Sequence, residues 1–161
     1  MLDCVVIGGG PAGLLAAVYL GRYRRSVKVI DAGESRAAKI PESHNYPGFF
    51  GIGGSEILCR LRAQAEEYGA QIVSGSVTSL LKKDDAFVAS GSIGAYDTRF
   101  VLLATGLVDY CPPIEDEPAN CHGAIRFCPI CDGYEAIDRR VGVLGDLGSG
   151  PIKVLAERSG C

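Results

Sequence analysis

The chain has 161 residues, a formal net charge of −3 and 47% hydrophobic residues, so it is long enough to bury a core and too apolar to be disordered. Its basic residues are scattered except for Arg22, Arg24 and Arg25, which excludes a basic stripe for nucleic acid. No run reaches the roughly 20 apolar residues of a membrane-spanning helix, and the seven irregularly spaced cysteines do not form a secreted disulfide framework, so we expect a cytoplasmic protein without membrane contact.

The first part of the chain has the pattern of two parallel strands joined by a helix. Residues 4–7 form a short apolar run, and the apolar side chains at positions 14, 15, 18 and 19 recur at helical spacing. Residues 27–30 form a second apolar run that ends at Asp31. We therefore predict a β-α-β unit of about 30 residues with the right-handed crossover of parallel strands.

The turn between the first strand and the helix has the sequence Gly-Gly-Gly-Pro-Ala-Gly at residues 8–13, which contains the pattern G-x-G-x-x-G. In this context the first glycine permits a tight turn, the second lets a diphosphate approach the backbone, and the third lets the helix pack on the strand. The proline suits the first helical turn, and Asp31 can bind a ribose hydroxyl. We predict dinucleotide binding here; the alternative is a close-packed turn without a ligand. The candidate cofactor-binding residues of this region are Gly8, Gly10, Pro11, Ala12, Gly13, Asp31 and Ala32.

Residues 32–54 are rich in Gly, Pro, Ser and Asn, and we interpret this long irregular segment as functional. Ser55 is expected to cap a helix that ends at Gly69. Between residues 70 and 100, short β-prone runs separated by turn residues predict an antiparallel meander. These runs are residues 71–73, 77–81, 87–89 and 93–96.

Residues 100–103 predict another buried strand, followed at once by Ala104, Thr105 and Gly106. Such a turn of small residues lets the backbone come close to a ligand, so these three residues are further candidates for cofactor binding.

The second part of the chain begins after a proline-rich, acidic segment at residues 107–120, which is the best candidate for a domain boundary. Residues 140–144 predict a strand that enters a second glycine-rich turn at residues 145–150, and a helical pattern follows over residues 152–156. The predicted domains are residues 1–110 and 111–161.

Cys128 and Cys131 form a C-x-x-C motif, for which three interpretations are open: a redox-active dithiol, half of a zinc site, or cysteines without special chemistry. Pro129 within the motif and Asp132 after it favour the dithiol, because a carboxyl group beside the sulfur atoms can relay protons during thiol exchange. The zinc interpretation would draw its other ligands from Cys111, Cys121 and His122.

Taken together, the sequence resembles the low-molecular-weight thioredoxin reductases and their relatives among the flavin-dependent pyridine nucleotide disulfide oxidoreductases. Four landmarks carry this resemblance in the order that the family has them, and the C-x-x-C landmark is the most specific. They are the turn at residues 8–13 with the following helix to Arg22, Asn-Tyr-Pro-Gly at 45–48, Leu-Ala-Thr-Gly at 103–106, and Cys-Pro-Ile-Cys-Asp-Gly at 128–133.

The resemblance implies an α/β protein: a Rossmann-like, doubly wound FAD-binding domain with the meander inserted, followed by the start of a domain that binds NAD(P)H. It implies an enzyme that passes electrons from NAD(P)H through FAD to the disulfide, and on to a thioredoxin-like protein or a small disulfide. In that cycle Cys131 would face the flavin, Cys128 would attack the substrate disulfide and Asp132 would handle the proton. The family also implies a homodimer.

The segment His-Asn-Tyr-Pro-Gly at residues 44–48 has two interpretations. Because Asn, Pro and Gly favour turns, it can be a plain turn. In the resembling family it would be a loop held against the flavin, with Asn45 supplying hydrogen bonds.

Two features depart from the family pattern. Leu147 occupies the second glycine position of the second nucleotide turn, where its side chain would meet the diphosphate, so we expect weakened nicotinamide binding. Family members are also roughly twice as long, as two full domains require, so we expect this chain to be an N-terminal portion. Two alternatives to the reductase are therefore open: an FAD-dependent dithiol oxidase that uses oxygen, and a non-catalytic flavin-binding or partner-binding module.

Overall fold

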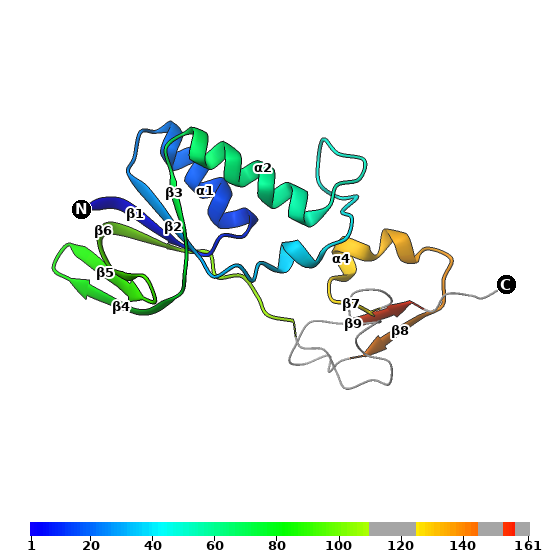
Figure 1. Cartoon of the computed structure of the whole chain (residues 1–161). Coiled ribbons are helices and arrows are strands. Elements are labelled where there is room, and N and C mark those ends of the chain that lie inside the picture. Colours follow the sequence, from blue (N-terminus) through cyan, green and yellow to red (C-terminus); the bar gives the residue numbers. More distant parts are fainter. Residues whose placement is uncertain (110–124, 145–152, 157–161) are drawn as a thin grey trace. The chain divides into compact units, whose positions relative to one another are not determined.

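The computed structural model describes residues 1–109, 125–144 and 153–156 (Figure 1). Contacts between residues divide the chain into two compact units, each considered separately below. The first comprises Met1–His44 with Gly51–Leu107, and the second comprises Asn45–Phe50 with Val108–Cys161. Within the described residues, no helix is long and apolar enough to cross a membrane.

The first unit contains a six-stranded sheet with the strand order β3-β2-β1-β6-β5-β4. Strand β1 pairs in parallel with both β2 and β6, and β2 pairs in parallel with β3. Strands β4, β5 and β6 are antiparallel to their neighbours in sequence. The strands are β1 (Leu2–Ile7), β2 (Val27–Asp31), β3 (Gln71–Ser74), β4 (Val77–Lys83), β5 (Ala86–Gly91) and β6 (Gly94–Leu103).

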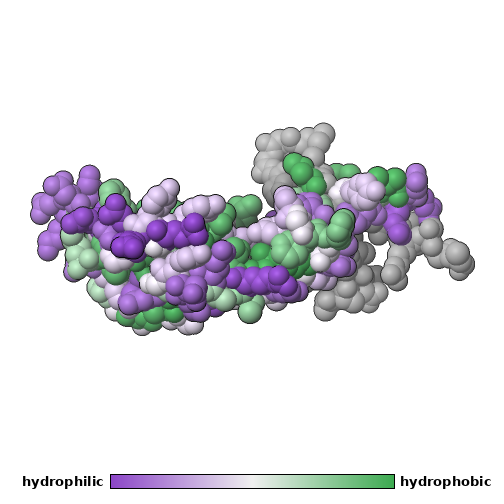
Figure 2. Space-filling model, turned by 90° about the horizontal axis from the view of Figure 1, so that it is seen from above, coloured by the Kyte–Doolittle hydropathy of each residue, from purple (hydrophilic) through white to green (hydrophobic). Residues whose placement is uncertain are grey.

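Helices α1 (Pro11–Arg22) and α2 (Gly54–Glu67) lie side by side on one face of this sheet, and a short 3₁₀ helix, η1 (Arg36–Lys39), precedes α2 (Figure 1). The helices approach closely where a Cβ atom on Gly21 would lie 2.6 Å from the carbonyl oxygen of Tyr68. Next to it, Nη1 of Arg22 donates a 2.9 Å hydrogen bond to the Tyr68 hydroxyl. The outer side of this helical layer is largely hydrophilic (Figure 2).

Each face of the central strands has its own core, as the alternation of side chains along a strand requires. Under the helices, the buried residues are Cys4, Val6, Ala17, Val18, Val27, Val29, Ala65 and Ala70. On the opposite face, Val5 and Ile30 pack against Ala89 of β5, with Tyr96 of β6 partly buried against them. The meander therefore covers the second face of the parallel strands, which bury apolar side chains on both faces.

The predicted β-α-β unit is confirmed, including Pro11 at the first position of α1 and the end of β2 at Asp31. Helix α2 ends at the predicted place, because Gly69 adopts a positive φ of +84°. The expected cap was wrong: Gly53 is the N-cap, and Ser55 lies inside the first turn, where its hydroxyl donates to the carbonyl oxygen of Ala38.

The prediction for residues 70–103 was partly wrong. The run at 71–73 is confirmed as a strand, but β3 pairs in parallel with β2 and is not part of the meander. The runs predicted at 93–96 and 100–103 belong to one strand, β6, which pairs with β5 over its first half and with β1 through residues 98–103. A single long strand thus joins the meander to the parallel sheet.

The described residues of the second unit form a three-stranded antiparallel sheet in the order β7-β9-β8. Its strands are β7 (Ile125–Arg126), β8 (Val141–Leu144) and β9 (Lys153–Ala156), and its short helices are α4 (Pro129–Asp132) and η2 (Tyr134–Ala136). Strand β8 confirms the strand predicted at 140–144. The helix predicted over 152–156 was wrong, because residues 153–156 pair on both sides as the central strand of this sheet. The second glycine-rich turn lies outside the described residues.

Candidate functional site

Three strand ends meet at one edge of the six-stranded sheet. The backbone N–H of Gly8, just after β1, donates a 2.9 Å hydrogen bond to the carbonyl oxygen of Ile30 in β2. The N–H of Ala104, just after β6, donates a 2.8 Å hydrogen bond to the carbonyl oxygen of Ile7. The glycine-rich bend, Asp31 and Ala104 therefore come together at the carboxyl ends of parallel strands, which is where open α/β sheets bind ligands.

The three glycines of G-x-G-x-x-G have different surroundings. A Cβ atom on Gly8 would lie 2.2 Å from the carbonyl oxygen of Ala104, and Gly8 has a φ of +115°. A Cβ atom on Gly13 would lie 2.0 Å from the carbonyl oxygen of Gly8. Among the described residues outside its chain neighbours and helix α1, the nearest atom to a Cβ on Gly10 would be the hydroxyl oxygen of Ser35, at 3.4 Å, which is an ordinary van der Waals contact. Packing thus requires the outer two glycines, whereas a side chain at the middle one would meet no close contact.

Helix α1 begins at Gly10 without a side-chain cap. Gly10 is its N-cap, Pro11 is its first residue, and its first turn holds no acidic side chain. The second residue, Ala12, is exposed. The N–H groups and the dipole at such a helix start favour an anion, and without a side chain at Gly10 a diphosphate can reach the backbone. These residues therefore fit the diphosphate of a dinucleotide.

Asp31 lies beside the bend and is only 9% exposed. Its Oδ1 accepts a 2.9 Å hydrogen bond from the N–H of Gly33, and its Oδ2 accepts one from Nη2 of Arg62 in α2. A Cβ atom on Gly9 would lie 2.1 Å from Cγ of Asp31. Ala32, which follows Asp31, is exposed.

The sequence patterns did not identify Gly9, Ser35 and Arg62, which contact Asp31 or Gly10 beside the glycine-rich bend. Gly9 lies at an unrestricted position of the motif, and Ser35 and Arg62 are 25 and 52 residues beyond Gly10 in the sequence. No local pattern identifies such residues, because only the pairing of β2 and the packing of α2 bring them to the bend.

The turn after β6 has one packed and two exposed residues. Ala104 packs against the core under the helices, and its backbone makes the close contact with Gly8 described above. Thr105 and Gly106 are exposed, and Gly106 has a positive φ of +70°. The backbone of Ala104 thus lies close to the glycine-rich bend, whereas Thr105 and Gly106 remain accessible to solvent.

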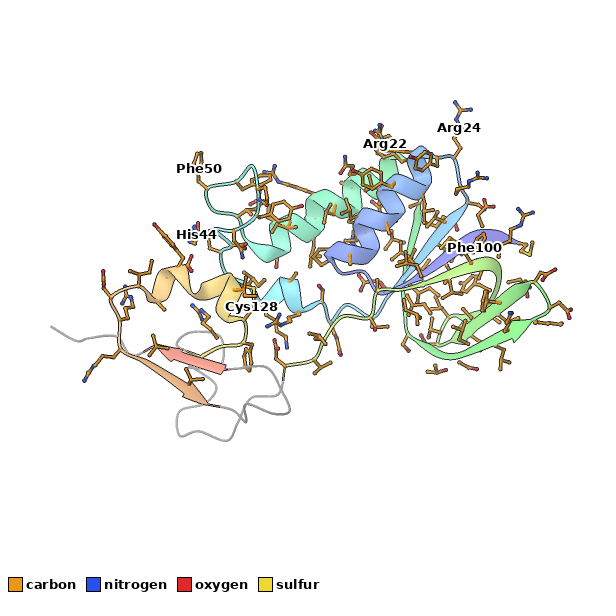
Figure 3. The ribbon with its side chains drawn as sticks, turned by 180° about the vertical axis from the view of Figure 1, so that it is seen from behind. Arg22, Arg24, His44, Phe50, Phe100 and Cys128 are labelled. Carbon is orange, nitrogen blue, oxygen red and sulfur yellow. A yellow bond between two sulfur atoms is a disulfide. The ribbon has the colours of Figure 1, made fainter. Side chains whose placement is uncertain are left out.

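The segment Asn45–Phe50 belongs to the second unit. Its turn is confirmed: the N–H of Phe49 donates a 3.2 Å hydrogen bond to the carbonyl oxygen of Tyr46, and Gly48 has a φ of +90°. Phe50 is fully exposed (Figure 3). The contact of Asn45 with a flavin stays a prediction.

Cys128 and Cys131 form a disulfide with a Cα–Cα distance of 5.2 Å. Cys128 is the N-cap of α4 (Figure 3), and its Sγ accepts a 3.2 Å hydrogen bond from the N–H of Cys131. Cys128 is half-buried and Cys131 is exposed. Asp132 is the last residue of α4.

Two sequence hypotheses fall outside the described residues. The zinc interpretation needs Cys111, Cys121 or His122, and the doubt about nicotinamide binding concerns Leu147; the structure describes none of these. Both stay predictions.

The parallel sheet, its glycine-rich bend and the helix that follows the bend define a Rossmann-like α/β domain. The profile of the family described as pyridine nucleotide-disulphide oxidoreductase matches residues 2–152, and the chain belongs to this family, which confirms the resemblance that the four landmarks indicated. A thioredoxin reductase from Treponema pallidum is 34% identical over 146 residues, which are 89% of this chain and 48% of that protein.

Solved structures agree with this assignment. A thioredoxin reductase from Streptococcus pyogenes matches with a TM-score of 0.80 at 27% identity, over 88% of this chain and 46% of that one. An oxidoreductase from Agrobacterium tumefaciens matches with a TM-score of 0.76 at 34% identity, over 86% of this chain and 48% of that one. The predicted fold class is therefore confirmed, and the chain spans about half the length of the relatives that it matches.

Proposed function

We propose that this chain is part of an FAD-dependent oxidoreductase of the thioredoxin reductase type, which passes electrons from NAD(P)H to the disulfide of Cys128 and Cys131 and then to a substrate disulfide. The observation that carries the proposal is the room for a side chain at Gly10, at the uncapped start of α1, between two glycines that have no such room. Packing among the described residues does not by itself require a glycine at this position.

In this proposal residues 1–110 bind FAD and residues 111–161 begin the NAD(P)H domain. The N–H groups at the start of α1 would bind the FAD diphosphate, and Asp31 would accept hydrogen bonds from the adenosine ribose. Residues 104–106 and Asn45 would contact other parts of the cofactor. The bound flavin would supply the chemistry that this chain lacks, the acceptance of two electrons from a nicotinamide and their transfer to a disulfide.

The reduced cysteines would then act in two steps. The Cys128 thiolate attacks the substrate disulfide, forming a mixed disulfide and releasing one substrate thiolate, which takes a proton for which Asp132 is the proposed donor. Cys131 next attacks the mixed disulfide, which releases the second substrate thiol and restores the bond between Cys128 and Cys131. One substrate disulfide thus becomes two thiols at the cost of two electrons and two protons.

The similarity to thioredoxin reductases supports a thioredoxin-like protein as the substrate, with a small disulfide as the other class. On the same basis we propose that the protein is a cytoplasmic homodimer. The dithiol oxidase and the non-catalytic module are the competing functions.

The test begins with the purified chain and added FAD. We expect a bound flavin with visible absorbance, bleached under anaerobic conditions by NADPH or NADH. Bleaching by a small dithiol and not by a nicotinamide would overturn the reductase in favour of the oxidase. Bound flavin that neither reagent bleaches would favour the non-catalytic module. Absence of flavin uptake, together with ordinary reactivity of both thiols after reduction, would overturn the reductase and the oxidase and would leave only a partner-binding module.

A further inference from the structure

The side chain of Arg62, in α2, extends to the carboxyl end of β2, beside the glycine-rich bend. Its Nη2 lies 2.5 Å from Oδ2 of Asp31, a residue 31 positions earlier in the chain. The side chain of Asp31 is 12% exposed and that of Arg62 is 39% exposed. The pair therefore joins the helical layer to the end of β2 at the border between core and solvent.

The carboxylate of Asp31 is restricted from three sides. Arg62 binds Oδ2, the N–H of Gly33 binds Oδ1, and the backbone of Gly9 lies so close to Cγ that no side chain fits there. A carboxylate oxygen has two lone pairs, so each oxygen can still accept one hydrogen bond. The contacts thus orient the carboxylate without using its full capacity as an acceptor.

We propose that Arg62 is a positioning residue for the adenosine ribose, acting through Asp31. This inference rests on the proposed binding of FAD at the glycine-rich bend. Arg62 would have two effects: it holds the carboxylate in the orientation in which the ribose hydroxyls can donate to it, and its positive charge offsets a negative charge that would otherwise repel the neighbouring diphosphate.

The inference predicts selectivity for the ribose hydroxyls. The probes are ADP and 2′,3′-dideoxy-ADP, which differ only in those hydroxyls, and their dissociation constants are measured by isothermal titration calorimetry. We expect the unaltered protein to bind ADP about tenfold more tightly than the dideoxy compound. In Arg62→Gln this ratio should fall below about threefold. If Arg62 had a purely structural role, Arg62→Gln would weaken the binding of both nucleotides equally and leave the ratio of their dissociation constants unchanged.

Helix α2 offers a matched control. Arg60 pairs with Glu56 on the exposed side of the same helix, with side chains that are 61% and 53% exposed. Arg60→Gln therefore removes an arginine ion pair two positions away, and it should keep the full ratio. Arg62→Lys should retain most of the ratio, because lysine keeps the charge and a donor, although not the planar guanidinium.

Two further outcomes separate this inference from the proposed function. If Arg62→Gln does not fold, the double variant Asp31→Asn/Arg62→Gln is compared with Asp31→Asn alone. The ratio of the two dissociation constants should then be the same in both variants, and a lower ratio in the double variant would overturn the inference. If Arg62→Gln keeps the about tenfold preference for ADP over the dideoxy compound, the positioning role of Arg62 is overturned, while the proposal that the chain binds FAD is unaffected. If the unaltered protein takes up neither FAD nor ADP, the proposed function fails together with this inference.

Discussion

The carbonyl oxygen of Gly8 lies 2.0 Å from the position that a Cβ atom on Gly13 would occupy, so the end of β1 and the start of α1 meet backbone to backbone. Gly13→Ala is therefore expected to destabilise the first unit. Alanine is favoured over glycine in a helix by about 1 kcal/mol, but overpacking against a rigid backbone typically costs about 1–3 kcal/mol, and the contact here is with backbone. Urea unfolding followed by circular dichroism should show a lower midpoint. A midpoint equal to or above that of the unaltered protein would contradict the close contact.

Gly10→Ala provides the opposite prediction from the same bend. Among the described residues, the nearest contact of the added methyl group outside the bend and α1 is the Ser35 hydroxyl oxygen at 3.4 Å, so the urea midpoint should stay close to that of the unaltered protein. The methyl group would occupy the path of a diphosphate, so FAD affinity should fall by at least about tenfold in a fluorescence titration. Unchanged affinity would show that no diphosphate approaches Gly10.

Asp3 should make stability depend on pH in the acid range. Its Oδ2 accepts hydrogen bonds from the backbone N–H and the hydroxyl of Ser26, at 2.8 and 2.7 Å. These bonds, the backbone one first, hold the pKa of Asp3 below its ordinary value of 3.8. Since the folded-state pKa is the lower one, the stabilisation is present above the unfolded pKa and is lost as pH falls through the folded pKa.

We therefore expect Asp3→Asn to lower the melting temperature at pH 7 and to have a smaller effect in acid, where Asp3 itself becomes protonated. In an NMR titration, Ser26→Ala should raise the pKa of the Asp3 carboxyl toward 3.8, because it removes the hydroxyl donor. An effect of Asp3→Asn that is equally large at both pH values would contradict this assignment.

The cysteines in the described part of the chain should differ in reactivity. Cys4 is 5% exposed, and burial raises the pKa of its thiol, although a backbone hydrogen bond at Leu102 acts in the opposite direction. Cys59 is exposed. Iodoacetamide at pH 8 should therefore label Cys59 much faster than Cys4, as judged by mass spectrometry of peptides, because the thiolate is the reactive form. Cys128 and Cys131 should be labelled only after reduction. Equal rates at Cys4 and Cys59 would contradict the buried position of β1.

Local patterns were sufficient for the first strand, helix and second strand. The apolar run before Gly8, the helical spacing after Pro11 and the acidic residue that ends β2 all lie within a short segment, and each was predicted correctly. The same patterns failed where pairing partners are distant: β3 pairs with β2, and residues 153–156 are a central strand despite their helical spacing. Pairing between strands depends on residues far apart in the chain, so it overrides local preference.

The sequence by itself determined the family, the glycine-rich bend and the C-x-x-C motif, because each is a short run whose spacing carries its own physical meaning. Only the tertiary structure decided which glycine of the bend has room for a side chain, and that Arg62 and Gly9 constrain the carboxylate of Asp31. The reason is physical: backbone clearance and ion pairing depend on where β2, α2 and β6 pack against the bend, and those contacts join residues 22 to 96 positions apart.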